Sequence, residues 1–264
     1  MKVAIIGCGN IGTSIADFII QDPFYKLHSL SDINKKNIQN LLKQVNQVPK
    51  FLALKDAIEE ADLIIEAANK EVVGEILLSK NIDSKNKRIL VMSTGGLIEE
   101  TTMNVIRNMK HCEVHIPSGA IAGLDAIQAI AGEIDSLKLK TVKPPQSLSN
   151  SPFIRLNNIQ LSGLKTKTVI FKGGLKEAIA GFPQSINIAA SLFLASRFDD
   201  IKIQIIADPN TQFNTHTILC KGKFGEINIK TENFPSNNPK TSYLAIQSAI
   251  SILKNITSNL KIGN

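Results

Sequence analysis

The sequence predicts an α/β domain with a parallel sheet over residues 1–118 and an α+β domain with a mostly antiparallel sheet over residues 119–239. Three observations support this division. Strand-like and helix-like segments alternate through the first part, a glycine-rich turn joins the first strand to the first helix, and strands of alternating polarity dominate the second part. We expect the last segment, residues 240–264, to include a helix that packs back on the first domain.

The first domain is expected to alternate between strands and helices. Residues 2–6 (KVAII) form a short β-branched run closed by a glycine, which is typical of a buried strand. The next segments, in chain order, are a helix over 11–21, a strand ending at Asp32, a helix over 34–47, a short strand, a helix and a strand within 51–69, a helix over 71–79, a strand over 87–97, a helix over 100–110 and a strand over 112–121. Such alternation favours parallel strands joined by crossover helices.

The second domain has a different pattern of polar and apolar residues. Its strands alternate polar and apolar residues, as expected of an antiparallel sheet with one solvated face. The expected segments are a helix over 123–134, strands over 134–145 and 157–174, a helical stretch over 174–198 broken near Pro183, strands over 201–209 and 215–233, and an amphipathic tail helix over 241–256. No linker separates the two domains, so we expect them to pack together with a cleft between them.

Composition excludes several classes of function. The net charge is +7, but the lysines are scattered and aromatic residues make up 5% of the chain, so no basic and aromatic platform for nucleic acid is expected. No apolar run reaches the roughly 18 to 20 residues of a membrane helix, and glycines interrupt the opening run too early for a secretion signal. Three widely spaced cysteines fit neither a disulfide framework nor a zinc site. We therefore expect a cytoplasmic protein with reduced thiols, and without metal, membrane or nucleic acid as partner.

The turn after the first strand has the spacing G-x-G-x-x-G at Gly7, Gly9 and Gly12. The first glycine permits a tight turn, the second lets the backbone approach a pyrophosphate, and the third lets helix and strand pack closely. Asn10 and Ile11 open the helix, whose N-terminal N–H groups favour phosphate. Because the motif follows a predicted strand and opens a predicted helix, it indicates a dinucleotide site of Rossmann type.

Asp32 lies about 20 residues beyond the glycines, at the end of the second strand, where a ribose hydroxyl needs an acceptor. Its charge would repel a 2′-phosphate, which favours NAD over NADP. Lys35 and Lys36 follow closely and leave NADP open, although a solvated helix start is the favoured interpretation of both lysines.

Four later segments resemble the L-aspartate dehydrogenase family: HIPSGAIAGLDAI (115–127), GFPQSINIAA (181–190), ADPNTQFNTHTI (207–218) and KGKFGEINIKTENFPSNNPKTSYLA (221–245). With the glycine turn, the resemblance spans nearly the whole chain. It implies a Rossmann domain followed by an α+β catalytic domain, and oxidation of L-aspartate by NAD or NADP. The product would be iminosuccinate, which gives oxaloacetate and ammonia or supplies NAD biosynthesis. The family also suggests a homodimer.

The resemblance also assigns residues. The family's active-site histidine corresponds to His216, and its further cofactor contacts correspond to Ala120 and Asn187. A histidine also suits the chemistry, because hydride leaves Cα only when the amine is neutral, and imidazole has a reference pKa of about 6.5. His28 and His111 are expected to be structural, whereas His115 lies near the SGAIAG turn and is an open candidate for the cleft.

Two positions depart from the family pattern: Ser185 replaces an asparagine, and Lys176 stands in place of an arginine. A lysine cannot form the bidentate contact of an arginine with a carboxylate, so this departure bears on how the substrate is bound. Lys176 and Lys240 are candidate anchors for the substrate carboxylates, with an ordinary solvated role as the alternative for each. Two other functions stay open: a dehydrogenase resembling homoserine dehydrogenase or dihydrodipicolinate reductase, and an NAD(H)-binding redox sensor without turnover.

Overall fold

The computed structural model describes residues 1–264 except 46, 81, 84–86, 184–185, 235–241 and 263–264. The chain divides into two compact units. The first comprises Met1–Pro117 together with Ile246–Lys261, and the second begins at Ser118 and runs to Ala245. The boundary predicted from the sequence lies between residues 118 and 119. Within the described residues, no helix combines the length and the apolar character needed to cross a lipid bilayer.

The first unit contains a six-stranded parallel sheet of order β3-β2-β1-β4-β5-β6. Its strands are β1 (Lys2–Ile6), β2 (Lys26–Ser31), β3 (Lys50–Phe51), β4 (Leu63–Glu66), β5 (Arg88–Val91) and β6 (Glu113–His115). The order reverses between β1 and β4, and an open parallel sheet binds its ligands at the carboxyl ends of the strands beside such a reversal. The parallel sheet predicted from the alternating segments is confirmed.

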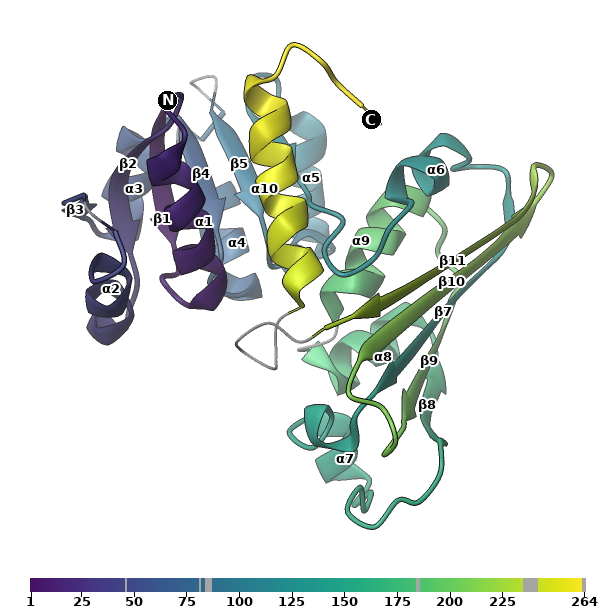
Figure 1. Ribbon diagram of the computed structural model, residues 1–264. Coiled ribbons are helices and arrows are strands. Elements are labelled where there is room, and N and C mark those ends of the chain that lie inside the picture. Colours follow the sequence, from purple (N-terminus) through teal and green to yellow (C-terminus); the bar gives the residue numbers. More distant parts are fainter. Residues whose placement is uncertain (46, 81, 84–86, 184–185, 235–241, 263–264) are drawn as a thin grey trace. The chain divides into compact units, whose positions relative to one another are not determined.

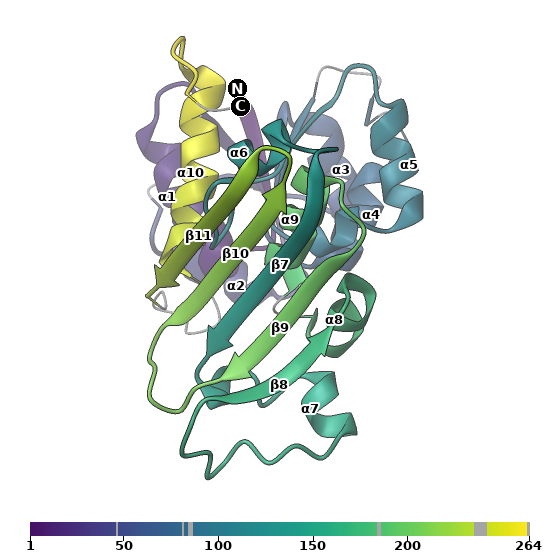
Figure 2. The same cartoon turned by 90° about the vertical axis from the view of Figure 1, so that its right-hand side faces the viewer.

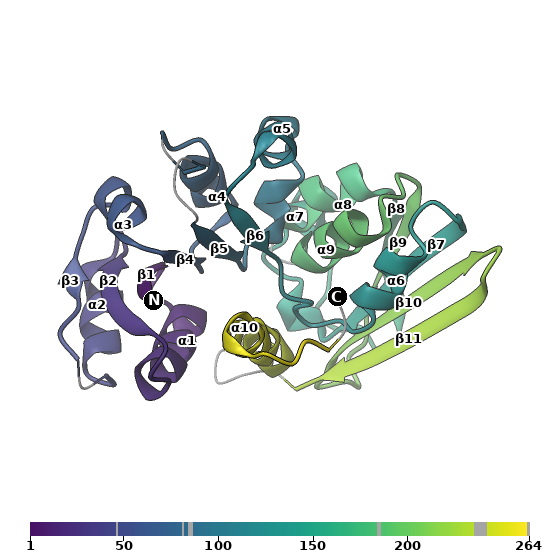
Figure 3. The same cartoon turned by 90° about the horizontal axis from the view of Figure 1, so that it is seen from above.

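Helices cover both faces of this sheet, as Figure 3 shows. On one face lie α1 (Asn10–Gln21), α2 (Lys35–Leu42) and α10 (Tyr243–Thr257); on the other lie α3 (Leu54–Glu60), α4 (Lys70–Leu77) and α5 (Glu100–Asn108). A short 3₁₀ turn, η1 (Thr94–Leu97), follows β5. Because both faces are covered, the central strands are apolar on both sides: Leu63, Ile64 and Ile65 of β4 are all fully buried.

The tail helix α10 belongs to this first unit from Ile246 onward. Ala249 and Leu253 lie in the core formed by β1, β2 and α1, and the Leu253 carbonyl accepts a hydrogen bond of 2.7 Å from the Tyr25 hydroxyl. The buried positions recur at helical spacing, which explains why the segment forms a helix with one apolar face. Figure 1 shows α10 beside α1.

The second unit contains a five-stranded mixed sheet of order β11-β10-β7-β9-β8. Its strands are β7 (Ile134–Lys143), β8 (Thr168–Gly173), β9 (Ile201–Ala207), β10 (Asn214–Gly222) and β11 (Gly225–Asn233). All neighbours pair antiparallel except β7 and β9, which are parallel. The mostly antiparallel sheet predicted for this part of the chain is confirmed.

Helices of the second unit pack on one face of its sheet, while the opposite face is turned toward the viewer in Figure 2. They are α6 (Leu124–Ala129), α7 (Pro152–Leu156), α8 (Leu175–Gly181) and α9 (Ile186–Ser196), with a 3₁₀ turn, η2 (Pro145–Ser147), after β7. Three phenylalanines, Phe153, Phe171 and Phe182, form a cluster of ring contacts in this core. The exposed positions of β7 carry the charged residues Asp135, Lys138 and Lys140, which explains the alternating pattern of the sequence.

The expectation of a strand over 157–174 is wrong in its first half. Regular pairing begins at Thr168, because Asn158 has φ +50° and Gly163 has φ +93°, conformations that interrupt an extended chain. The helix α7 was not expected, since five residues carry too short a pattern to recognise. The break near Pro183 is confirmed: α8 ends at Gly181 and α9 begins at Ile186.

Candidate functional site

The turn between β1 and α1 is shaped around glycine. Gly7 has φ +95°, and its N–H donates a 2.8 Å hydrogen bond to the Ser31 carbonyl at the end of β2. A Cβ on Gly7 would lie 2.5 Å from the Ala67 carbonyl oxygen, and one on Gly12 would overlap the Gly7 carbonyl. Any side chain at either position would therefore push the turn away from β4 or push α1 away from β1.

Gly9 differs from the other two glycines because a Cβ there would meet no described atom within 4 Å. Gly9 is the N-cap of α1, so Asn10, Ile11 and Gly12 form the first helical turn. The N–H groups of such a turn favour an anion, and the open space beside Gly9 lets a ligand approach the backbone there. The turn thus fits the pyrophosphate of a dinucleotide.

Asp32 follows β2 and fastens the glycine turn to that strand. Its Oδ2 accepts hydrogen bonds from the Cys8 N–H (2.7 Å) and the Asn37 amide (3.1 Å), and its Oδ1 accepts one from the Asn34 N–H (2.7 Å). A carboxylate offers about four lone-pair sites, so an acceptor site remains for a ribose hydroxyl. Burial and the neighbouring Asp32 charge raise the pKa of the Cys8 thiol to about 12, which keeps it protonated and unreactive.

A cavity of about 580 Å³ lies at the carboxyl ends of β1, β2 and β4. Gly7, Gly9 and Asp32 line it together with Asn34 and Asn69. The remaining wall is largely apolar and includes Ile33, Leu52, Leu54 and Val72. Ile33 is completely exposed, although an isoleucine beside a cavity is an ordinary contact surface for a planar ring. The mixture of apolar slot, acceptor carboxylate and glycine turn fits the adenosine and pyrophosphate parts of a dinucleotide.

Glu66 supports the same edge of the sheet, and it was not among the residues predicted from the sequence. It ends β4, is 0% exposed, and accepts hydrogen bonds from the Ala68 N–H (2.8 Å), the Ser93 N–H (2.8 Å) and the Ser93 hydroxyl (2.9 Å). Burial raises the pKa of its carboxyl, and the hydrogen bonds from Ser93 and Ala68 oppose that shift. Glu66 thereby joins the turn after β4 to the turn after β5. The sequence signal that could have identified Glu66 is a carboxylate inside the otherwise apolar run LIIEAA (63–68).

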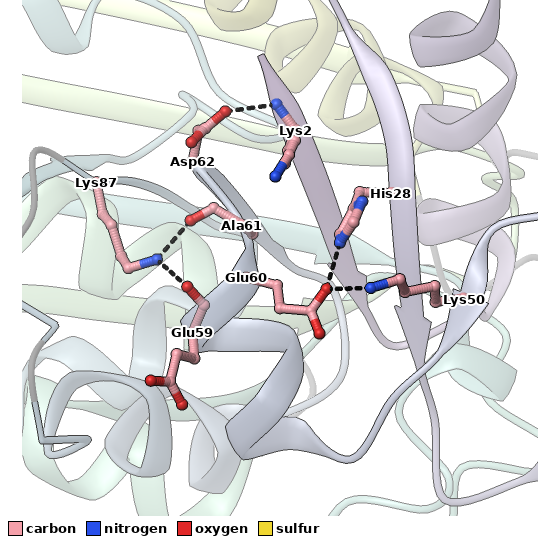
Figure 4. Close-up of polar contacts among 8 residues, drawn as sticks. All are labelled: Lys2, His28, Lys50, Glu59, Glu60, Ala61, Asp62 and Lys87. Atoms are coloured by element: carbon pink, nitrogen blue, oxygen red, sulfur yellow. Dashed lines mark hydrogen bonds and ion pairs between the residues drawn. The ribbon is translucent and has the colours of Figure 1, made fainter.

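The opposite, amino edge of this sheet holds a second cavity of about 560 Å³, lined by Lys2, Asp56, Glu59, Glu60, Ala61, Asp62 and Lys87. Figure 4 shows that Glu60 and Lys87, two of the charged residues that line it, bind neighbouring groups. Glu60 accepts from His28 Nε2 (2.7 Å) and Lys50 Nζ (2.6 Å), and the buried Lys87 ammonium donates to the Glu59 and Ala61 carbonyls at the end of α3. These contacts tie strands to α3, so the charges serve the fold.

His216 lies on β10 in the second unit and is 2% exposed. It pairs with Thr141 of β7, whose hydroxyl is 3.1 Å from His216 Nδ1, and with Thr231 of β11. Burial and the charge of Lys143 lower the pKa of His216 to about 3. The imidazole is therefore neutral at physiological pH, and its pKa lies well below that of a solvated histidine.

Ala120 is held close to His216 through β11. Its carbonyl accepts hydrogen bonds from the Thr231 hydroxyl (2.9 Å) and the Asn233 amide (2.8 Å), and Thr231 is the cross-strand neighbour of His216. Asn187 lies at the start of α9, and Lys176 lies exposed at the start of α8. Among the described residues, no hydrogen bond or ion pair joins Lys176 to His216. Lys240 and Ser185 lie outside the described residues.

The other histidines each contact a carboxylate through a side chain or a backbone N–H. His28 binds Glu60, His111 contributes its backbone N–H to Asp83 (2.8 Å), and His115 Nε2 lies 3.4 Å from Glu113. Burial lowers the pKa of His115. Over the ranges that the structure describes, no three His, Cys, Asp or Glu side chains gather as metal ligands would.

A glycine turn with an acidic residue on a parallel sheet, followed by a buried histidine on a second sheet, defines a two-domain dehydrogenase of Rossmann type. The family profile described as "Homoserine dehydrogenase, NAD binding domain" matches residues 7–116, and "Aspartate dehydrogenase, C-terminal" matches residues 125–256. The chain belongs to the L-aspartate dehydrogenase family, and the resemblance predicted from its segments is confirmed.

Curated relatives and solved structures agree with this assignment. L-aspartate dehydrogenases of Methanococcoides burtonii and Nitrosopumilus maritimus are 38% and 36% identical, and each alignment covers at least 99% of both chains. The crystal structure of aspartate dehydrogenase from Thermotoga maritima matches with a TM-score of 0.74 at 26% identity, over 100% of this chain and 99% of that one. An archaeal homoserine dehydrogenase in complex with NADPH shares the fold, with a TM-score of 0.60 at 10% identity over 100% and 99% of the two chains.

Proposed function

We propose that this protein oxidises L-aspartate to iminosuccinate with NAD or NADP as hydride acceptor. The observation that carries the proposal is the neutral, buried His216 on a chain whose first unit has a dinucleotide cavity, within a family of L-aspartate dehydrogenases. The bound cofactor supplies an electrophilic nicotinamide ring that accepts the hydride from Cα. All other steps fall to the side chains of this chain and to water.

His216 is the proposed catalytic base. Oxidation of the amine requires that Cα loses a hydride and that nitrogen loses a proton, which leaves a C=N bond. A neutral imidazole can accept that proton, and the contact of Nδ1 with Thr141 leaves Nε2 for the substrate. The same nitrogen would then direct water onto the imine carbon, which releases oxaloacetate and ammonia.

The glycine turn and Asp32 are the proposed cofactor-binding groups of the first unit. Gly7 would shape the turn, Gly9, Asn10, Ile11 and Gly12 would hold the pyrophosphate through backbone N–H groups, and Asp32 would accept from a ribose hydroxyl. The charge of Asp32 favours NAD, because a 2′-phosphate would meet a carboxylate.

In the second unit, Ala120 and Asn187 are the proposed further cofactor contacts. Lys176, exposed at the start of α8, is the proposed anchor for a substrate carboxylate within the described residues. We further propose a cytoplasmic homodimer that supplies NAD biosynthesis, without nucleic acid or membrane as partner.

The test is an initial-rate assay with purified protein. NAD and NADP are offered side by side with L-aspartate, and NADH and NADPH with oxaloacetate and ammonia. Reduction of NAD by L-aspartate at a higher kcat/KM than reduction of NADP supports the proposal. Turnover of L-homoserine or reduction of dihydrodipicolinate without turnover of L-aspartate would assign a related dehydrogenase instead. Cofactor binding without any turnover would assign a sensor.

A further inference from the structure

Lys143 and Asn214 lie together at one corner of the second sheet, on the face that carries His216. Thr141 of β7 pairs with His216 of β10, and Val142 pairs with Thr215. The next position in this antiparallel register sets Lys143 opposite Asn214. Because side chains alternate between faces, Lys143 lies on the face of Thr141, and Asn214 lies on the face of His216, which is the same face.

The backbone holds Lys143 in place at the end of its strand. Its carbonyl accepts a 2.9 Å hydrogen bond from the Asp208 N–H, which prolongs the pairing of β7 with β9 by one residue. Pro144 follows and has no N–H to continue the ladder, so β7 ends there. The position of this lysine relative to His216 is thus set by two neighbouring strands.

The positive charge of Lys143 affects the pKa of His216. The ammonium lies deep enough that burial lowers the pKa of Lys143 to about 8, and its positive charge contributes to the depressed pKa of His216. The strand register, which sets both residues on one face of neighbouring strands, accounts for this influence. The nearby carboxylate of Asp208 accepts from the Asn210 N–H and lies 3.3 Å from the Lys167 ammonium.

Asn214 supplies an independent sign of a ligand. Its side-chain oxygen is buried, and no described residue donates a hydrogen bond to it. A buried acceptor without a donor is costly, and such atoms in native proteins usually await water or a ligand. Asn214 precedes His216 by two residues on β10. The amine of a substrate bound there would donate the hydrogen bond that the Asn214 side-chain oxygen lacks.

We propose that the Lys143 ammonium binds a carboxylate of the substrate and that the Asn214 side-chain oxygen accepts from its amine. The proposal deepens the proposed function, on which it rests, by naming residues that select an acidic amino acid. It also bears on the low pKa of His216, which burial lowers most and the charge of Lys143 lowers further. A substrate carboxylate beside Lys143 offsets the positive charge that acts on His216, so the bound acidic substrate strengthens the base that must deprotonate it.

The experiment compares Lys143→Met and Asn214→Ala with the wild type, using full-length protein. The matched control is Lys140→Met, which removes an exposed lysine from the other face of the same strand. Three quantities are measured for each protein: the KM for L-aspartate, the affinity for NADH, and the inhibition constant of succinate, a dicarboxylate that lacks the amine.

Lys143→Met is expected to raise both the KM for L-aspartate and the inhibition constant of succinate by roughly 10- to 100-fold. This change in affinity corresponds to the loss of one hydrogen bond to a charged group. Asn214→Ala is expected to raise the KM for L-aspartate while the inhibition constant of succinate stays within about two-fold, because succinate has no amine. NADH affinity and the Lys140→Met variant should match the wild type.

An unchanged succinate inhibition constant in Lys143→Met would overturn the assignment of Lys143, and equal effects of Asn214→Ala on both ligands would overturn that of Asn214. If Lys143→Met fails to fold, Lys143→Gln provides the same comparison with an uncharged side chain of similar length. Failure of the proposed function is distinguishable, since the wild type itself would then not oxidise L-aspartate.

Discussion

The two units form their candidate sites from different groups. In the first unit, the cavity beside Gly7 and Gly9 presents backbone, and the carboxylates Asp32 and Glu66 act mainly by holding turns through N–H groups. In the second unit, His216 and Lys143 are side chains on neighbouring strands, and burial lowers the pKa of both. One site is defined by shape, and the other by the electrostatics of buried side chains.

This difference separates binding from chemistry. Substitutions in the first unit should alter cofactor affinity or stability and leave the reacting groups intact. Substitutions around His216 should alter turnover and leave cofactor affinity intact. Single-residue variants test that separation, from the largest expected effect to the smallest.

His216→Ala should lower kcat by roughly 10²- to 10⁴-fold, the usual contribution of a general acid or base. Its NADH affinity, measured by fluorescence titration, should match the wild type, because the dinucleotide cavity lies in the first unit. Thr141→Val, which removes the partner of Nδ1 and keeps the side-chain shape, should lower kcat less. Equal kcat in His216→Ala and the wild type would reassign the base.

Gly9→Ala and Gly12→Ala should have different effects on thermal stability and NADH affinity. A Cβ at Gly9 enters open space, so the folded protein should keep its melting temperature while NADH affinity falls by roughly 10- to 100-fold through exclusion of the pyrophosphate. A Cβ at Gly12 meets the Gly7 carbonyl, so that variant should lose stability itself. Thermal unfolding and NADH titration separate the two results. Unaltered NADH affinity in Gly9→Ala would remove the turn from the cofactor site.

Glu66→Gln should destabilise the first unit by about 1 to 3 kcal/mol, because the amide NH₂ would face N–H and O–H donors of Ser93 and Ala68. The raised pKa in the folded state means that Glu66 binds its proton more tightly folded than unfolded. Its contribution to stability therefore falls as pH rises above the ordinary value of 4.5.

Denaturant unfolding at about pH 5 and about pH 8 measures this effect. The wild type should lose more unfolding free energy over that interval than Glu66→Gln, which cannot titrate. Parallel losses in the two proteins would show that the environment of Glu66 does not raise its pKa.

Glu60→Gln at the amino edge of the same sheet should have the smallest effect. Its carboxylate binds His28 and Lys50 on the surface, far along the strands from the glycine turn. We expect kcat and NADH affinity to equal those of the wild type. A loss of either would mean that the amino-edge cavity takes part in function.

The parts that were predictable from the sequence are those that depend on local spacing. The glycines and Asp32 lie within 26 residues of one another and directly follow two strands, so their pattern carries the geometry. The alternation of strands and helices likewise predicted the parallel sheet. The family resemblance, rather than any spacing, pointed to His216, Ala120 and Asn187.

The parts that escaped prediction depend on register between distant strands. Thr141 is 75 residues from His216 and meets it through the pairing of β7 with β10. Lys143 and Asn214 share their corner for the same reason, and one lysine among many on an alternating strand gives no local signal. The depressed pKa of His216 follows from burial, which a sequence pattern does not measure.

Hydride transfer from L-aspartate labelled with deuterium at Cα tests the central claim most directly. The account predicts that the purified protein transfers the deuterium to the nicotinamide ring, so that mass spectrometry finds labelled NADH formed in step with oxaloacetate. NADH that carries no label, or no NADH formed from L-aspartate at all, would contradict it.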